Sequence, residues 1–261
     1  MKRDPGDVGL NTNPPDTNPT APGHLAGGVP AAGGQFILER RARLVRPLFP
    51  EPGGHLVDFG CGNGAQTLFF IADFDRVTGV DISETFLQDF RREIVSRGLQ
   101  NRVEAVVTEG GPVPLPDGAA DVVTSFTVLE HVPDEQAALA EMRRILKPGG
   151  KLILSVPNRW WIFETHGADL PLLRWNRVPL VSWWPKKLHD RWARARIYRR
   201  REIENLLVKS GFSIDISFRM TAPMDMIPWR PMRRMVRSVF FRPDRAFSPF
   251  QATEIVVAAT R

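Results

Sequence analysis

The stretch that decides the fold is Val57-Asp58-Phe59-Gly60-Cys61-Gly62-Asn63-Gly64, a short apolar run that leads into three glycines at alternate positions. Glycine adopts positive φ angles and lets a ligand approach the backbone with no Cβ in the way. A second apolar run, 76–80, ends at Asp81, about 20 residues after the first glycine. An acidic side chain at that distance can accept hydrogen bonds from ribose hydroxyls. The two runs predict neighbouring strands that bind an adenosine-containing cofactor.

The glycine spacing separates two classes of such cofactor. The pattern is G-x-G-x-G, whereas dinucleotide sites use G-x-G-x-x-G to give a pyrophosphate room at the start of a helix. We therefore expect a cofactor without phosphate, bound by a loop that leads into a helix over 65–71. A nicotinamide-dependent oxidoreductase shares this kind of sheet and is the alternative.

Strands and helices alternate along the chain. Ser83 is a good helix N-cap, Gly98 is typical of a helix end, and Pro133-Asp134 is typical of a helix start. This alternation predicts an α/β fold, with a parallel sheet and helices on both faces. The last two expected strands lack a clear crossover helix between them, and we expect them to pair antiparallel. Beyond the first two strands, the patterns predict strands at 102–107, 121–126, 151–156, 212–218 and 253–259, and helices at 36–46, 83–99, 133–146 and 199–209.

Composition limits the domain organisation. With 261 residues, 43% of them hydrophobic, the chain can bury one sizeable core, so we expect one domain over 35–261. Residues 1–34 are rich in Pro, Gly, Asn and Thr and are expected to form a disordered tail. The single cysteine, Cys61, excludes an intramolecular disulfide and a Cys-rich metal site.

The chain shows no signal-peptide h-region and no apolar run of the roughly 18 residues that a spanning helix needs. These features predict a cytoplasmic protein. Peripheral contact at the inner membrane face is a second expectation.

The positive charge is unevenly placed. Residues 1–158 carry a net charge of −5, whereas residues 159–201 carry +8 and residues 219–245 carry +5. Such a split indicates a binding surface more than a uniformly basic protein. The two basic segments define expected inserts at about 158–198 and about 220–250.

Both inserts are rich in large apolar side chains. Six of the seven tryptophans lie between Trp160 and Trp192, among arginines and lysines, directly after the fifth expected strand. That position predicts a cap over the acceptor, since aromatic and basic groups together bind sugars, anions or membrane interfaces. Packing within the insert is the alternative. In the second insert an apolar stripe at helical spacing lies opposite arginines, which predicts an interfacial helix or, alternatively, a packed helix face: Met232, Met235, Val236, Val239 and Phe240.

Five motifs in order resemble those of the class I S-adenosylmethionine-dependent methyltransferases, particularly the small-molecule type 11 group that includes quinone-biosynthesis enzymes. The motifs cover about 36–157, together with the helix and strands after 198. The resemblance implies a Rossmann-like sheet of seven strands, mostly parallel with an antiparallel last strand, and S-adenosylmethionine as the cofactor. The motifs are 57–64, 80–83, 114–117 with 121–123, 128–132, and 146–152.

The resemblance also implies roles for individual residues. Asp81 would bind the ribose hydroxyls, with Ile82 against the adenine, and Asp58 would orient the loop and the amino group of the cofactor. Glu109-Gly110 stands where the family usually has Asp-Ala, so the carboxylate that accepts from the adenine amino group is displaced by one methylene. The remaining expected cofactor contacts are Gly60, Cys61, Gly62, Gly64 and Phe126.

The expected reaction places few demands on the protein. A sulfonium is already an activated methyl donor, so the protein must position the acceptor and supply a base if a hydroxyl loses its proton. No metal is required by the reaction. His131, after the fourth expected strand, is the first candidate base, ahead of His166 and Glu164; capping or loop packing is the alternative for His131.

The expected acceptor is a small molecule, a glycan or a lipid-linked compound that is methylated at oxygen. The two basic segments favour one that is anionic, lipid-linked or both. A nucleic-acid methyltransferase would explain the positive charge, but Ser125-Phe126-Thr127 stands where an Asn-Pro-Pro-Tyr-like base-flipping motif would follow the fourth strand. A catalytically silent cofactor-binding scaffold is the alternative outside the enzymes.

Overall fold

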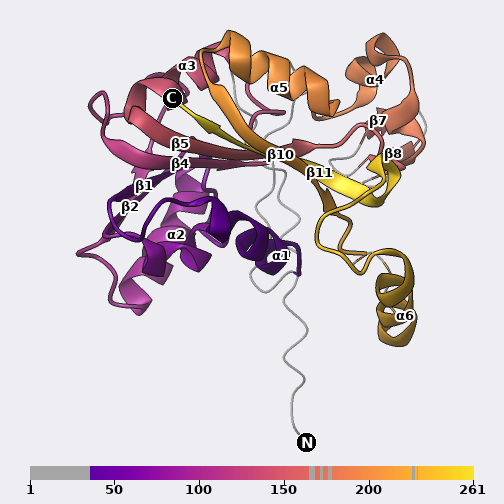
Figure 1. Cartoon of the computed structure of the whole chain (residues 1–261), viewed down its shortest axis with the longest axis horizontal. Coiled ribbons are helices and arrows are strands. Elements are labelled where there is room, and N and C mark those ends of the chain that lie inside the picture. Colours follow the sequence, from indigo (N-terminus) through magenta and orange to yellow (C-terminus); the bar gives the residue numbers. More distant parts are fainter. Residues whose placement is uncertain (1–35, 165–167, 171–172, 176–177, 225–226, 228) are drawn as a thin grey trace, which may run out of the picture.

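The computed structural model describes residues 36–164, 168–170, 173–175, 178–224, 227 and 229–261, so the expected tail 1–34 lies outside the described residues. Seven strands form one sheet in the order β10-β11-β5-β4-β1-β2-β3 (Figure 1). The strands are β1 (His55–Phe59), β2 (Arg76–Asp81), β3 (Val103–Val107), β4 (Ala120–Phe126), β5 (Leu146–Pro157), β10 (Ser213–Thr221) and β11 (Ala252–Thr260).

One strand of the sheet runs against the others. β11 pairs antiparallel with both β5 and β10, whereas the pairs that β1, β2, β3, β4 and β5 make with one another are all parallel. This arrangement confirms the predicted α/β fold with an antiparallel last strand. The carboxyl ends of β1, β2 and β4 therefore lie at one edge, where ligands bind such sheets.

Helices cover both faces of the sheet. In Figure 1, α1 (Phe36–Val45) and α2 (Glu84–Ser96) lie on one side, and α3 (Glu135–Ile145) and α5 (Arg200–Lys209) lie on the other. Successive strand residues alternate between the two cores: Leu56 packs with α1 and α2, whereas Val57 packs with α3 and α5. Because both faces are buried, the strands read as nearly continuous apolar runs.

Local signals set the helix ends. The Ser83 hydroxyl accepts from the Phe86 N–H at the start of α2, and the Asp134 carboxylate accepts from Gln136 N–H and Ala137 N–H at the start of α3. Gly98, with φ of 67°, follows the end of α2. These caps confirm the predicted starts and the predicted exit.

The predicted helix over 65–71 is wrong. Two 3₁₀ turns, Thr67–Phe69 and Ile71–Asp73, stand in its place. The Thr67 hydroxyl is bonded to the buried Asp58 carboxylate, and the buried rings of Phe70 and Phe74 pack edge-on against Phe49. We attribute the break to these anchors, which fix the segment from two sides.

The first basic insert leaves the sheet after β5 and returns to α5. It contains two short antiparallel pairs, β6 (Phe163–Glu164) with β9 (Val178–Pro179) and β7 (Ala168–Leu170) with β8 (Leu173–Trp175). The 3₁₀ turn Val181–Trp183 and the helix α4 (Lys186–Trp192) follow.

The second insert, between β10 and β11, contains α6 (Arg230–Phe240). Among the residues that the structure describes, no helix combines the length and apolar character needed to cross a membrane.

Gly64 offers a direct test of how the glycine loop is packed. Its φ is 75°, and a Cβ there would lie 2.0 Å from the ring of Phe90 on α2. Gly98 has a similar φ of 67°, but a Cβ there would meet no atom within 4 Å. We expect Gly98→Ala to lower the free energy of unfolding by about 1–2 kcal/mol through backbone strain. Gly64→Ala should cost about 1–3 kcal/mol more, because the ring must move. Equal losses in chemical denaturation would contradict this packing.

Candidate cofactor and active site

The Asp81 carboxylate joins the glycine loop to the second strand. Gly62 N–H donates to its Oδ2 (2.8 Å) and Ser83 N–H donates to its Oδ1 (2.9 Å). A carboxylate offers about four acceptor positions, so each oxygen keeps capacity for another donor. Burial raises the pKa of the Asp81 carboxyl group, although the backbone donors oppose this rise.

The backbone of the loop lies close to the end of β2. Gly60 N–H and Cys61 N–H both donate to the carbonyl of Val80, at 2.7 and 3.0 Å. Gly60 has a φ of 78°, and a Cβ there would lie 2.3 Å from Cγ2 of Val128. Glycine is therefore required at 60 by the backbone and by the neighbouring loop.

Asp58 lies beneath the loop with 2% of its surface exposed. Its Oδ2 accepts from the Thr67 hydroxyl (2.5 Å) and its Oδ1 from the Thr124 hydroxyl (2.8 Å). Burial raises the pKa of Asp58, opposed by the two hydroxyls and by the charge of Arg41. This carboxylate fixes β1, β4 and the loop relative to one another.

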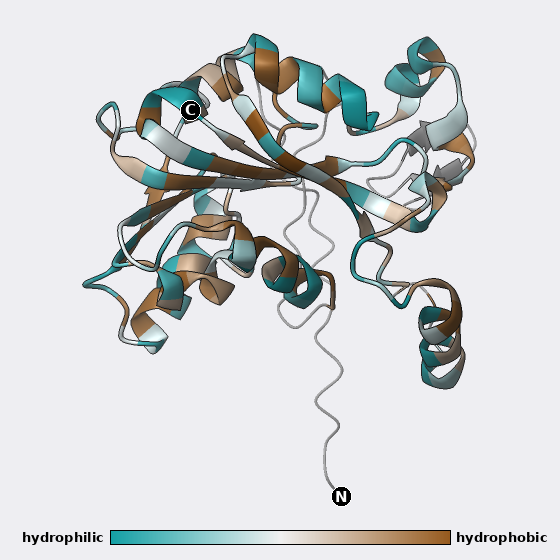
Figure 2. Ribbon diagram, viewed as in Figure 1, coloured by the Kyte–Doolittle hydropathy of each residue, from teal (hydrophilic) through white to brown (hydrophobic). Residues whose placement is uncertain are grey.

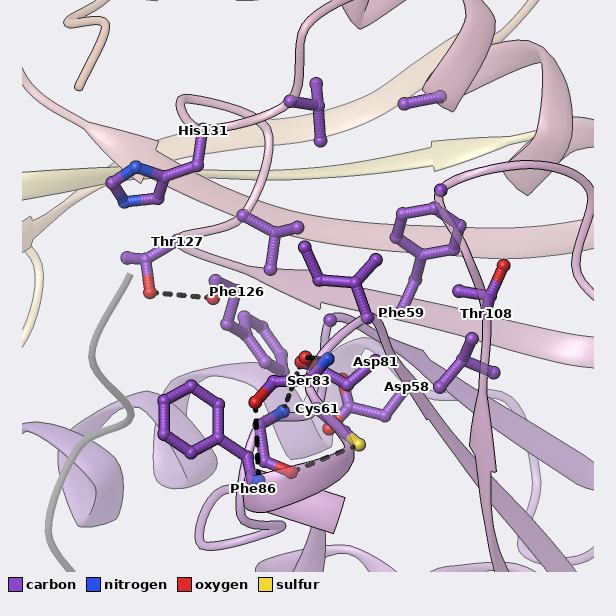
Figure 3. Close-up of a pocket in the computed structure, with 18 of the residues that line it drawn as sticks. Asp58, Phe59, Cys61, Asp81, Ser83, Phe86, Thr108, Phe126, Thr127 and His131 are labelled. Carbon is purple, nitrogen blue, oxygen red and sulfur yellow. Dashed lines mark hydrogen bonds between the residues drawn. The ribbon is translucent and has the colours of Figure 1, made fainter. Parts of the chain in front are cut away.

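These groups line a cavity of about 610 Å³, a size typical of cofactor and small-ligand sites. The predicted residues that line it are Asp58, Gly60, Cys61, Gly62, Asp81, Ile82, Gly110, Phe126 and His131. In Figure 3, His131 and Thr127 lie on one side, Thr108 lies on the other, and Asp81 and Ser83 lie between them. A loop open to close approach and a carboxylate with spare acceptor positions fit the predicted adenosine-containing cofactor.

Two predicted site residues do not line the cavity, and the side chains of the two candidates in the first insert are not among those that the structure describes. Gly64 does not line the cavity, because its backbone packs against Phe90 instead. Glu109 is exposed and does not line it either, whereas Thr108, Gly110 and Gly111 do. His166 lies outside the described residues, and the structure describes the backbone of Glu164 but not its side chain. No described residue of either basic insert lines the cavity.

Cys61 is buried, and burial raises the pKa of its thiol well above the ordinary value. A thiol with a raised pKa remains neutral and is a poor nucleophile. This agrees with a residue that is present for its small size.

Arg41 of α1, which was not among the predicted site residues, is buried and lines the cavity. Its guanidinium donates to both carboxylate oxygens of Glu254 on β11 (2.6 and 3.2 Å) and to Oε1 of Gln66 (3.2 Å). It also lies over the ring of Phe126, 5.2 Å from the centroid. The sequence does contain a signal that could have identified this residue: Arg41 lies on the apolar face of the helix predicted over 36–46.

The turn after β4 carries the candidate base. Thr127 has a φ of 55°, an uncommon value for a residue other than glycine, and its hydroxyl donates to the Phe126 carbonyl (2.7 Å). His131 N–H donates to the Val128 carbonyl (2.9 Å) and closes the turn. Backbone strain of this kind often occurs at functional sites.

The acidity of Asp81 and Asp58 leads to a pH prediction. Because their pKa values are raised, both carboxyl groups take up a proton at a higher pH than an exposed aspartate, whose pKa is about 3.9. Because ribose hydroxyls and an ammonium group donate to the ionised form, affinity for S-adenosylhomocysteine should fall as pH is lowered from 8 towards that range. Asp81→Asn should weaken binding about tenfold or more at pH 8 and flatten the pH dependence. Isothermal titration calorimetry measures both effects, and a wild-type affinity that is constant down to about pH 4 would contradict the assignment.

Comparisons with known proteins agree with this geometry. Residues 57–154 match a family described as methyltransferase domain. An uncharacterized 37.1 kDa protein in transposon TN4556 of Streptomyces fradiae is 31% identical over 177 residues, which cover 66% of this chain and 47% of that protein. The ubiquinone/menaquinone biosynthesis C-methyltransferase UbiE of Shewanella halifaxensis (strain HAW-EB4) is 36% identical over 107 residues, which cover 40% of this chain and 43% of that one. The chain spans about half the length of the curated relatives it matches.

Solved structures share the fold. The crystal structure of an S-adenosylmethionine-dependent methyltransferase from Mesorhizobium loti superimposes with a TM-score of 0.60 at 20% identity. The match covers 86% of this chain and all of that one. At this identity the likeness concerns the fold alone.

Proposed function

We propose that this chain transfers the methyl group of S-adenosylmethionine to a small-molecule acceptor, because residues 57–154 match a methyltransferase-domain family and the fold is similar to that of an S-adenosylmethionine-dependent methyltransferase. The observation that carries the proposal is the Asp81 carboxylate, held by Gly62 N–H and Ser83 N–H with acceptor positions to spare. A carboxylate that served only to hold the backbone would not need to lie in a cavity beside a glycine loop that a ligand can approach.

Different described residues would bind different parts of the methyl donor. Asp81 would accept from the ribose hydroxyls, Ile82 would hold the adenine, and Asp58 would orient the amino group. Gly60 and Gly62 allow the donor to lie directly on the backbone. When bound, S-adenosylmethionine supplies a methyl group already activated on a sulfonium sulfur. The remaining task of the chain is to align the acceptor with that methyl group and to exclude water.

The acceptor side of the cavity favours a compound with an apolar body. Leu38, Phe126, Val128 and Val132 line the cavity along with His131. Arg41 also lines it but is neutralised by Glu254, so the cavity itself gives little support for an anionic group. Support for an anionic or lipid-linked acceptor comes instead from the charge of the two basic inserts.

We assign His131 as the general base for an acceptor hydroxyl. A ring nitrogen of His131 would take the hydroxyl proton as the acceptor oxygen bonds to the methyl carbon and the bond from that carbon to the sulfonium sulfur breaks, which would leave a neutral thioether. The imidazole borders the cavity beside the strained Thr127. Methyl transfer to an electron-rich carbon is the second candidate. It is favoured by the name of the Shewanella relative, a C-methyltransferase.

The test is transfer of a carbon-13 methyl group from the labelled donor to fractionated lipids, small molecules, glycans, proteins and nucleic acids. We expect label in the small-molecule or lipid fraction, and the carbon-13 chemical shift of the product distinguishes a methyl on oxygen from one on carbon. Label confined to nucleic acid, or no transfer to any fraction despite tight S-adenosylhomocysteine binding, would overturn the proposed acceptor class or the activity.

His131→Gln tests the base separately from the donor site. We expect kcat to fall by about 10²–10⁴, with S-adenosylhomocysteine affinity unchanged. Asp81→Asn is the contrasting control, because it should weaken donor binding instead. An unaltered kcat in His131→Gln would assign the residue to loop packing.

A further inference from the structure

α6 exposes its apolar residues, whereas a surface helix usually buries them. Its apolar residues recur at helical spacing and point outward: Met235 is 60% exposed, Val239 65% and Phe240 62%. Its arginines occupy the opposite arc, and Arg237 lies over the ring of Phe36 on α1, 3.3 Å from the centroid. An ordinary amphipathic helix buries its apolar stripe and exposes its charges. In α6 the middle of the polar arc faces the protein and the apolar arc faces away.

This orientation is fixed at the base of the insert. Asp244, just after α6, accepts from Arg43 through both oxygens (2.7 and 3.1 Å) and lies 3.0 Å from Nε of the buried Arg40. Thr221 N–H donates to the Asp244 carbonyl, and Ala222 N–H donates to the Gln251 carbonyl. Figure 2 shows α6 standing apart from the sheet and its covering helices, with both hydrophobic and hydrophilic residues along it.

The exposed apolar surface continues beyond the helix. Trp229, at the N-cap of α6, is 63% exposed. Phe250, further along the insert, packs edge-on against Trp160 and Trp183 of the first insert, at centroid distances of 5.7 and 5.8 Å. The two inserts thus meet through aromatic rings, and Trp183 and Phe250 in this contact are also exposed. Exposed Trp and Phe next to arginines are typical of residues at a membrane interface.

The positive charge of residues 229–243 indicates that this segment binds an anionic surface. Residues 229–243 contain five arginines and no carboxylate. Arg230 in the first turn of the helix and Arg234 one turn later are exposed, and Arg242 is exposed just beyond the helix. Long arginine side chains at these positions can reach lipid headgroups while the apolar arc enters the acyl boundary. Each basic residue near an anionic membrane surface contributes roughly fivefold in affinity.

We propose that α6 docks this protein on an anionic lipid surface, with its apolar arc in the membrane interface. The insert begins and ends at the sheet edge that holds the cavity: β11 starts at Ala252, and Glu254 on that strand bonds Arg41, which lines the cavity. Docking therefore brings the active site close to lipid-borne acceptors. The proposal deepens the proposed function, but docking is measured without methyl transfer, so either can fail alone.

The test is co-sedimentation of the full chain with phosphatidylcholine vesicles, with and without phosphatidylglycerol. We expect recovery with the anionic vesicles, weaker recovery with neutral ones, and loss of binding as salt is raised. Val239→Glu should reduce binding at least tenfold. Arg234→Glu should reduce binding to anionic vesicles only.

Val208→Glu is the matched control. Val208 lies on α5 and is 58% exposed, close to the 65% of Val239, so the same change at similar exposure should leave vesicle binding intact. All variants should keep wild-type S-adenosylhomocysteine affinity, which shows that they fold and separates docking from donor binding.

Two results would overturn the proposal. One is equal recovery of wild type and Val239→Glu with anionic vesicles. The other is a dimer of the wild-type chain in analytical ultracentrifugation that Val239→Glu converts to monomer, without vesicle binding by either, which would make the apolar arc a contact between copies.

Discussion

The structure of the site depends on the bridge between Asp81 and the glycine loop. One carboxylate oxygen holds Gly62 N–H and the other holds Ser83 N–H, which begins the connection to α2. The same side chain therefore sets the loop conformation and the start of a helix, and it still has acceptor positions for a ribose. Asp58 plays the corresponding part below the loop through Thr67 and Thr124. Burial raises the pKa of both carboxyl groups, which means that it disfavours their ionised forms. A bound ligand with a positive charge and hydroxyl donors would stabilise those ionised forms.

The arginines of α1 connect this site to the second insert. Arg41 faces the cavity and pairs with Glu254 on β11, whereas the adjacent Arg40 donates to the carbonyls of Thr221 and Ala222, where the second insert begins. Both guanidinium groups are buried, so removal of either would leave polar partners unsatisfied. Through these two side chains the helix that borders the cofactor cavity also supports the segment that carries α6.

Much of the fold could be predicted from the sequence, because its signals are local. The apolar runs, the caps at Ser83 and Asp134 and the exit at Gly98 each depend on a few neighbouring residues. The helix over 65–71 failed because Asp58 and Phe49, both outside the segment, fix it through tertiary contacts. Gly64 was predicted to contact the cofactor because the spacing of the glycines indicates that a glycine is needed there. The spacing does not indicate whether a ligand or the ring of Phe90 requires it. Arg41 was missed because its partner Glu254 is far away in sequence.

The central claim is that the loop and Asp81 bind an adenosine cofactor without a pyrophosphate. Calorimetric titration of the wild-type chain with S-adenosylhomocysteine and, separately, with NAD tests it most directly. The account predicts one S-adenosylhomocysteine bound per chain and no heat of binding with NAD. Saturable binding of NAD together with no binding of S-adenosylhomocysteine would contradict it.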